Sequence, residues 1–303
     1  MAPLDCLVIG GGPAGLTAAI YLARFRLGVT VVDAGSSRAD LIPLSHNHAG
    51  YPEGIGGRDL VARMREQAEL YDVPIVSDEV VALDRDGELF VAVGAAGGTW
   101  RARSVLLATG VVNHRPEMDD DLHDAALAAG RLRYCPICDG YEVTDRRVGV
   151  IARGTKGPDE AVFLRGYTKD VTLIALDGAA GWQDARARLE DAGIALADGP
   201  VAGFVLEDAG LRVDLPGGPI LLDSLYPAMG SDIRSDLAKR LGANVSPDGC
   251  LEVDDHQRTT VAGLYAAGDV VKGLDQISHA MGEGGVAATT IRNDLAKERP
   301  FYR

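Results

Sequence analysis

The chain is poor in the features that mark several classes of protein. Its four cysteines among 303 residues are too few for a disulfide framework, so a small disulfide-stapled scaffold is excluded. No apolar run reaches the roughly 18 residues of a membrane span, so no membrane association is expected. Lysine and arginine number 30 against 44 aspartates and glutamates, and the resulting net charge of −14 repels polyphosphates, so no nucleic-acid partner is expected.

The composition that is present indicates a globular chain of two domains. At about 150 residues per domain the length fits two, each able to bury its own core. Glycine (38 residues) is frequent while proline (14 residues) is not, which marks glycine-rich loops rather than disorder. No basic stretch precedes the short apolar segment Cys6 to Ile9, so we expect a cytoplasmic protein.

A strand, a glycine-rich turn and a helix open the chain. Residues Leu4 to Ile9 form an apolar run typical of a parallel strand covered on both faces, and GGGPAG follows at residues 10–15. A helix is predicted from Ala14 to about Arg26, and the next strand from Gly28 to Asp33. This is the pattern of a βαβ unit that binds a dinucleotide.

The residues of this turn suit the binding of phosphates. Gly10 permits the tight turn, Gly12 lets the backbone approach a pyrophosphate, and Gly15 lets helix and strand pack closely. Pro13 fits the first turn of the helix, whose N-terminus meets the phosphates. Asp33, at the end of the next strand, is placed to hold an adenosine ribose.

A similar pattern returns in mid-chain with altered residues. We predict a strand at Arg147 to Ile151, a glycine-bearing turn at Ala152 to Gly157, a helix from Asp159 to about Gly166, and a strand at Val171 to Leu176. This is a second Rossmann-like unit in which the glycine motif is degraded.

Two further apolar strands define the domain organisation. Val105 to Gly110 and Gly263 to Asp269 each end in a small-residue turn, and neither belongs to the middle unit. If both complete the N-terminal sheet, the middle unit is an insertion. We therefore predict an α/β fold of two Rossmann-like dinucleotide-binding domains, the second inserted into the first, with residues 1–114 and 242–303 forming one domain and residues 115–241 the other.

Two of the four cysteines form a C-x-x-C motif within the middle domain. In a reducing compartment such a pair is redox-active or binds a metal. Cys6 and Cys250 do not supply the second half of a zinc site, and His46 and His48 are distant in sequence from the motif at residues 135–138. No metal site is predicted, and the dithiol becomes the candidate for redox chemistry.

Several motifs occur together in a fixed order along the chain. The motifs are GGGPAG at residues 10–15, Asn47 ahead of Gly50-Tyr51-Pro52, ATG at residues 108–110, CPICDG at residues 135–140, and AAGD at residues 266–269 followed by Gln276. In that order they resemble the low-molecular-weight thioredoxin reductases, flavoproteins with two dinucleotide domains, over essentially the whole length.

The resemblance implies an FAD cofactor, a homodimer, and a thioredoxin-like protein or a small disulfide as substrate. Residues 1–114 and 242–303 would then be the FAD-binding domain, and residues 115–241 the NAD(P)H-binding-like domain. Asp269 would lie at the ribitol chain, with the backbone of Gln276 and Ile277 at the flavin ring. The implied FAD contacts are Gly10, Gly12, Pro13, Ala14, Gly15, Asp33, Asn47, Ala108, Thr109, Gly110, Gly268, Asp269, Gln276 and Ile277.

The resemblance also assigns roles to the dithiol. Cys138 would face the flavin, and Cys135 would attack the partner's disulfide through a mixed disulfide. Asp139 would donate the proton, although it also suits a plain helix-start position. His279 has two interpretations, a solvated residue at a helix end or a group near the flavin or dithiol.

The second turn departs from what an NADPH-dependent enzyme requires. Its first glycine position is Ala152, and the basic cluster that would hold a 2′-phosphate is replaced by Ala175-Leu176-Asp177. We therefore expect NADPH to be a poor electron donor, with ferredoxin or another non-pyridine donor ranked first and NADH second. Two other functions stay open, a dithiol oxidase that passes electrons to O₂ and a flavin redox sensor that does not turn over.

Aromatic residues make up only 5% of the chain, yet two adjacent ones stand near its end. The hypothesis for Phe301 and Tyr302 is that one of them packs on the flavin or at a dimer interface. A solvated tail is the alternative.

Overall fold

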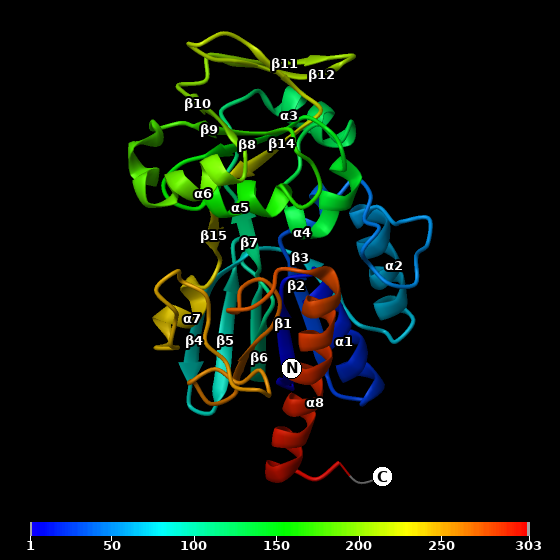
Figure 1. Cartoon of the computed structure of the whole chain (residues 1–303). Helices are drawn as coiled ribbons and strands as arrows, with labels where there is room; N and C mark the ends of the chain where they lie inside the picture. Colours follow the sequence, from blue (N-terminus) through cyan, green and yellow to red (C-terminus); the bar gives the residue numbers. More distant parts are fainter. Residues whose placement is uncertain (1, 302–303) are drawn as a thin grey trace.

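The computed structural model describes residues 2–301, except the side chains of residues 179 and 180, so Tyr302 lies outside the described residues. Figure 1 shows two α/β units stacked along one axis, with both described ends of the chain in the same unit. The fold class predicted from the sequence, two Rossmann-like units, is confirmed. No described helix is long and apolar enough to cross a bilayer.

The first unit is built around a seven-stranded sheet. Its strand order is β3-β2-β1-β6-β5-β4, and β16 adds to β6 beside β5. Strand β1 pairs in parallel with β2 and β6, as a dinucleotide-binding sheet requires. The strands are β1 (Leu4–Ile9), β2 (Val29–Asp33), β3 (Ile75–Ser77), β4 (Val80–Asp86), β5 (Leu89–Gly94), β6 (Thr99–Leu107) and β16 (Leu264–Ala266).

Helices α1 (Pro13–Arg24) and α8 (Ile277–Glu298) pack together on one face of this sheet (Figure 1). Their contact is close because a Cβ at Gly284 would lie 2.3 Å from the carbonyl oxygen of Ala14. The first unit also holds α2 (Gly57–Glu69) and the 3₁₀ helix η1 (Arg38–Leu41). The C-terminal helix is thereby fixed against the N-terminal glycine turn.

The second unit has a four-stranded parallel sheet and a smaller antiparallel one. The parallel sheet runs β10-β9-β8-β14, and β11, β12 and β13 form the antiparallel sheet. The strands are β8 (Val148–Ala152), β9 (Val171–Ala175), β10 (Ala195–Asp198), β11 (Gly203–Glu207), β12 (Gly210–Asp214), β13 (Ile220–Leu222) and β14 (Ser224–Ala228). The helices are α3 (Asp120–Ala128), α4 (Pro136–Asp139), η2 (Gly140–Val143), α5 (Gly157–Leu164), η3 (Ala179–Ala185) and α6 (Arg186–Asp191).

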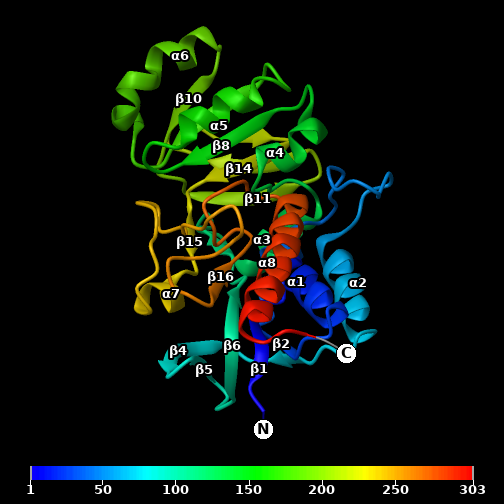
Figure 2. The same cartoon turned by 90° about the horizontal axis from the view of Figure 1, so that it is seen from below.

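Two short strands connect the units. Strand β7 (Val111–Asn113) pairs antiparallel with β15 (Ser231–Ile233), and Figure 2 shows β15 between the parts. The predicted boundaries at 114/115 and 241/242 stay predictions. The packing of Ala238, on α7 (Asp236–Arg240), in the core of the first unit favours a second crossing at β15, before α7.

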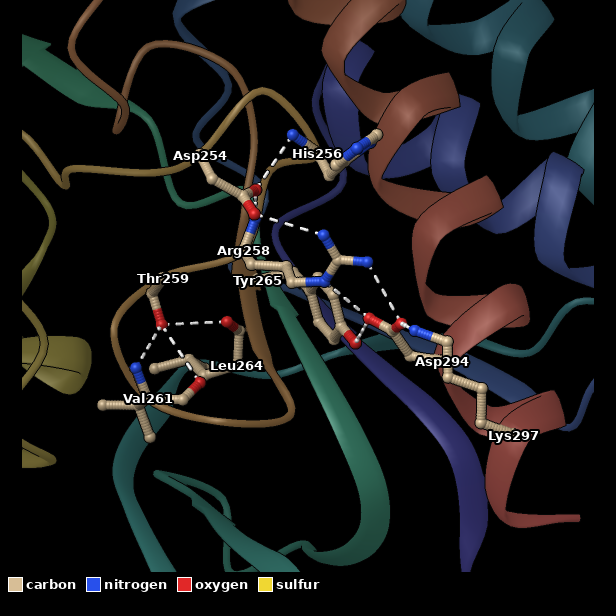
Figure 3. Close-up of polar contacts among 9 residues, drawn as sticks. All are labelled: Asp254, His256, Arg258, Thr259, Val261, Leu264, Tyr265, Asp294 and Lys297. Atoms are coloured by element: carbon tan, nitrogen blue, oxygen red, sulfur yellow. Dashed lines mark hydrogen bonds and ion pairs between the residues drawn. The ribbon is translucent and has the colours of Figure 1, made fainter.

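A polar cluster ties the loop before β16 to α8 (Figure 3). Arg258 donates to both oxygens of Asp294, at 2.7 and 3.0 Å, and to Asp254 at 3.1 Å. The hydroxyl of Tyr265 and the ammonium of Lys297 also donate to Asp294, at 2.9 and 2.8 Å. The hydrogen bonds from Arg258, Lys297 and Tyr265 hold the pKa of Asp294 below its usual range. Hydrogen bonds from the backbone N–H groups of Arg258 and His256, together with the Arg258 side chain, lower the pKa of Asp254.

The C-terminal tail does not reach the glycine turn or the cysteines. Phe301 packs against the core of the first unit beyond the end of α8. Helix α8 has 22 residues and is about 33 Å long, so Phe301 lies a helix length away from Gln276. Phe301 therefore does not line the cavity between the two units of its own chain, and its packing at a dimer interface stays a prediction.

Candidate active site

A cavity of about 1010 Å³ lies between the two units. The structure brings together around it Cys135, Cys138 and Asp139 and all the implied FAD contacts except Gly15. The lining FAD candidates are Gly10, Gly12, Pro13, Ala14, Asp33, Asn47, Ala108, Thr109, Gly110, Gly268, Asp269, Gln276 and Ile277.

The first glycine turn forms a tight cradle at one side of the cavity. Gly10 has φ +109°, and a Cβ there would lie 2.2 Å from the carbonyl oxygen of Ala108. A Cβ at Gly15 would lie 2.0 Å from the carbonyl oxygen of Gly10, which explains why Gly15 supports the turn without lining the cavity. Gly12 is the N-cap of α1 and is approached only by Ser37, so backbone N–H groups at this helix end face the cavity.

Asp33 lies at the end of β2, as the sequence predicts, and is held on both oxygens. The N–H of Gly11 donates to Oδ1 at 3.0 Å, and Arg65 of α2 pairs with Oδ2. The Asp33 side chain is 9% exposed. Arg65 was not identified from the sequence, because its partner is 32 positions away and the pattern of α2 gives no signal for it.

A second charged group lines the cavity. Arg38 bridges Asp269 at 2.9 Å and Asp275 at 2.7 Å. Burial raises the pKa of Asp269, and Arg38 opposes that rise. Sequence analysis identified Asp269 but not the arginine that pairs with it.

His279 does not lie beside the cysteines. Its Nε2 contacts Glu283 at 3.0 Å, and the other oxygen of Glu283 accepts a hydrogen bond from the N–H of Gly268 at 2.7 Å. His279 is 43% exposed and does not line the cavity. His279 thus lies partly exposed at the start of α8, and its charge also acts on Asp269, so both interpretations stay predictions.

Cys135 and Cys138 form a disulfide, with Cα atoms 5.2 Å apart. Cys135 is the N-cap of α4, and Pro136 begins the helix. The N–H of Cys138 donates to the Cys135 sulfur at 3.2 Å, an arrangement that stabilises a thiolate at Cys135 when the bond is reduced. Within the described residues no group of three or more His, Cys, Asp and Glu side chains has the arrangement of a metal site.

A chain of amides and a hydroxyl leads from the loop after η1 to the disulfide. The Gln276 amide Nε2 donates to the Cys138 sulfur at 3.2 Å and to the Cys135 sulfur at 3.4 Å. Asn47 donates to Gln276 at 2.8 Å, and Ser45 donates to Asn47 at 2.9 Å. Asn47 and Gln276, 229 positions apart in sequence, are thus joined at the disulfide.

Asp139 lies at the end of α4, next to Cys138. Arg133 donates to Oδ2 at 2.8 Å and the Tyr226 hydroxyl donates to Oδ1 at 2.9 Å. Burial raises the pKa of Asp139, and the positive charge of Arg133 opposes that rise. Burial and the adjacent carboxylate raise the pKa of Tyr226, so the phenol stays a donor.

The second glycine turn, in the central unit, packs closely against β8 at Gly157, whereas a Cβ at Gly154 would meet no atom within 4 Å. A Cβ at Gly157 would lie 2.3 Å from the Cβ of Ala152 and 3.5 Å from the Trp182 ring. The indole of Trp182 is 5% exposed and donates to the carbonyl oxygen of Gly154 within the turn. Arg153 pairs with Asp177 at 3.4 Å. Asp177 follows the end of β9, where a 2′-phosphate would need a positive charge.

Helix α5, which follows this turn, also disfavours the binding of an anion. Asp159 and Glu160 occupy the first turn of α5, where a pyrophosphate would approach. Burial raises the pKa of Glu160 to about 7. Trp182 and Glu160 were not identified from the sequence, and Asp159 was identified only as the predicted start of this helix.

Comparison with known proteins identifies the family to which this chain belongs. The pattern of the family described as pyridine nucleotide-disulphide oxidoreductase matches residues 4–284. A thioredoxin reductase of Streptomyces coelicolor is 32% identical over 317 residues, covering 98% of this chain and 93% of the relative.

Solved structures agree over nearly the whole chain. Thioredoxin reductase from Streptococcus pyogenes MGAS5005 superposes with a TM-score of 0.88 at 25% identity, covering 98% of this chain and 99% of that one. The atypical thioredoxin reductase TRi from Desulfovibrio vulgaris Hildenborough is 32% identical, with a TM-score of 0.56 and coverage of 99% and 100%.

Proposed function

Since this chain belongs to the pyridine nucleotide-disulphide oxidoreductase family, we propose that it is an FAD-dependent reductase of disulfides that acts on thioredoxin or a thioredoxin-like protein. The observation that carries the proposal is that Cys135–Cys138 and the first glycine turn line one cavity. A dinucleotide seated on that turn would have its far end at the disulfide.

The residues of the cavity fit FAD. The turn at Gly10 to Gly15 offers the close backbone approach and the helix N-terminus that a pyrophosphate needs. Asp33 supplies acceptor oxygens for an adenosine ribose, and Asp269 for the ribitol hydroxyls. When bound, the flavin would supply two-electron transfer to the disulfide.

Within this scheme the two sulfurs have different roles. Cys138 would be the flavin-side sulfur and Cys135 the one that exchanges with the substrate disulfide. This assignment is supported by the hydrogen bond that a Cys135 thiolate would accept from the N–H of Cys138. Asp139 gives and takes the proton. The Gln276 amide lies within reach of both sulfurs and favours the charged form of either.

The proposed electron donor is not NADPH. Ala152 stands at the first glycine position of the turn that would receive the pyrophosphate, and Trp182 donates to the carbonyl oxygen of Gly154 in that turn. Asp177, which pairs with Arg153, would repel a 2′-phosphate. Two lost contacts to that phosphate weaken affinity by about 10² to 10⁴-fold, at roughly 1.5 to 3 kcal/mol each. We rank ferredoxin or another non-pyridine donor first, NADH second and NADPH third.

The donor is tested by mixing the FAD-loaded protein anaerobically with NADPH, NADH and reduced ferredoxin in separate experiments. Flavin absorbance should fall rapidly with a non-pyridine donor and slowly or not at all with micromolar NADPH. Reduction by micromolar NADPH within milliseconds would overturn the ranking and restore NADPH as the donor.

We also propose that the protein is a homodimer, on the resemblance to thioredoxin reductases. Size-exclusion chromatography with light scattering should give twice the chain mass of 31.8 kDa. A monomer at all concentrations tested would contradict this part of the proposal.

A further inference from the structure

The carboxylate of Asp139 is held on both oxygens, by an arginine six positions before it and by a tyrosine 87 positions after it. Arg133 donates to one oxygen at 2.8 Å, and Tyr226, from β14, donates to the other at 2.9 Å. The side chains of Arg133 and Asp139 are 19% and 21% exposed, and Tyr226 is fully buried. The contacts therefore lie in a largely desolvated place, where hydrogen bonds to charge are strong.

Both partners of Asp139 are themselves fixed by the end of the central sheet. The Arg133 Nε donates to the carbonyl oxygen of Gly130 at 3.1 Å and to the hydroxyl of Ser224 at 3.3 Å. Ser224 and Tyr226 are neighbours on the same face of β14, which pairs with β8. Strand β14 thus sets the position of a carboxylate that follows the C-x-x-C motif on another element.

We propose that Arg133 and Tyr226 are positioning residues for the proton transfer that accompanies opening and closing of the Cys135–Cys138 bond. This inference rests on the proposed function. It assigns to this chain a means of holding the Asp139 carboxylate in one orientation, in the cavity that the disulfide also lines.

The proton step balances as follows. Two electrons from the reduced flavin break the S–S bond, and the Cys135 sulfur is released as a thiolate. The Cys138 sulfur takes a proton from the Asp139 carboxyl, and the proton lost on flavin oxidation replaces it. In the reverse direction, when a dithiol reduces the flavin, the Asp139 carboxylate takes the proton from Cys138.

The groups around Asp139 determine whether replacing a neighbour raises or lowers the pKa of its carboxyl. Burial and Glu142, from η2, raise its pKa, whereas Arg133 and Tyr226 lower it. Removing Arg133 or Tyr226 should therefore raise the pKa of Asp139, and removing the charge of Glu142 should lower it.

The test is the pH profile of flavin reduction by dithiothreitol, measured anaerobically with the FAD-loaded full chain. Asp139 acts as the base in this direction, so the rate falls on the acid side as Asp139 becomes protonated. We call this fall of the rate at low pH the acid limb of the profile. Arg133→Gln should move the midpoint of the acid limb to higher pH by about one unit or more, because a neighbouring arginine lowers a carboxyl pKa by about 1 to 3 units. Tyr226→Phe should move it upward by less, and Glu142→Gln should move it downward.

Controls separate positioning from general damage to the fold. Arg133→Lys keeps the charge and should return the limb toward the wild-type pH. Arg101→Gln removes a surface arginine whose 2.8 Å pair with Asp86 is exposed, and it should leave the limb in place.

The outcomes distinguish this inference from the proposed function. If wild-type flavin is not reduced by the dithiol, the proposed function fails. If it is reduced and Asp139→Asn abolishes the limb, but Arg133→Gln and Tyr226→Phe change the rate equally at every pH, the positioning role is wrong. A shift of the limb in both variants, reversed in Arg133→Lys, supports it.

Discussion

The two cysteine sulfurs have different surroundings, which supports separate roles for them. Only the Cys135 sulfur accepts the N–H at the start of α4, whereas Cys138 lies beside Asp139. In Cys135→Ser we expect the remaining Cys138 thiolate to give a long-wavelength charge-transfer band with oxidised flavin. Cys138→Ser should give none. A band in Cys138→Ser alone would reverse the assignment.

The Gln276 amide should stabilise the thiolate by a hydrogen bond that the alanine variant lacks. Loss of a donor worth about 1 kcal/mol raises the thiolate pKa by roughly 0.7 units in Gln276→Ala. The pH at which the charge-transfer band of Cys135→Ser appears measures this shift. Gln183, exposed on the central unit, provides a matched control, and equal titration in both alanine variants would contradict the role of Gln276.

Residues with a local sequence signal were predicted, and residues defined by a distant partner were not. The glycine turn and the C-x-x-C carry their signal within a few positions, so both were identified before the structure. Arg38 pairs with Asp269 across 231 positions, and Tyr226 meets Asp139 across 87. An arginine or a tyrosine in a strand or short helix has no pattern of its own that reveals such a partner.

At the scale of elements, the anchoring of α8 to the loop before β16 depends on Asp294. This carboxylate accepts hydrogen bonds from Arg258, Tyr265 and Lys297 (Figure 3). Asp294→Asn should lower the free energy of unfolding by about 2 kcal/mol near pH 7, a value reduced for solvent screening because Arg258 is about a third exposed. Urea denaturation measures the loss, and Asp86→Asn at an exposed pair should cost less than about 0.5 kcal/mol.

The same cluster sets a pH dependence of stability. The folded-state pKa of Asp294 is lowered, so its contribution is present above the unfolded pKa of about 3.9 and is lost as pH falls through the folded pKa. The difference in unfolding free energy between wild type and Asp294→Asn should therefore shrink below about pH 4. A difference that stays constant down to pH 2 would contradict this account.

The strength of periodic signals decided which elements could be predicted. The strand Leu4–Ile9 was predicted with its observed bounds, and the first helix to within two residues at its C-terminal end. The antiparallel sheet β11-β12-β13 was not predicted, because its short strands depend on pairing with each other rather than on an apolar run. The second turn was predicted to be degraded. The contact that Trp182 makes with it could not be predicted, because Trp182 lies 25 positions after Gly157 and outside the motif.

At the scale of the whole molecule, the units are joined by β7 and β15 and meet at the cavity. A 32% identical relative superposes over its whole length with a TM-score of only 0.56, whereas a 25% identical one reaches 0.88. Such different TM-scores are expected if the two units keep their folds in all these proteins but sit at different positions relative to each other. A protein substrate that must contact Cys135 would require the units to separate, because this sulfur faces the cavity.

This separation predicts how Cys135 reacts with reagents of different size. In reduced Cys138→Ser, iodoacetamide should alkylate Cys135 quickly, and a polymer-linked maleimide more slowly at a rate set by opening. Loading the protein with FAD should slow the large reagent more than the small one. If the large reagent fails to react over hours while the small one reacts, the units do not separate enough for a protein partner.

The central claim is that electrons pass from flavin through Cys135–Cys138 to thioredoxin, whatever the donor. The most direct measurement is the anaerobic reoxidation of chemically reduced, FAD-loaded protein on mixing with oxidised thioredoxin, followed by flavin absorbance. The wild type should regain its oxidised flavin spectrum while two thioredoxin thiols appear for each flavin reoxidised. The protein with both cysteines changed to serine should not. Reoxidation at the same rate in the double variant, or none in the wild type, would contradict the account.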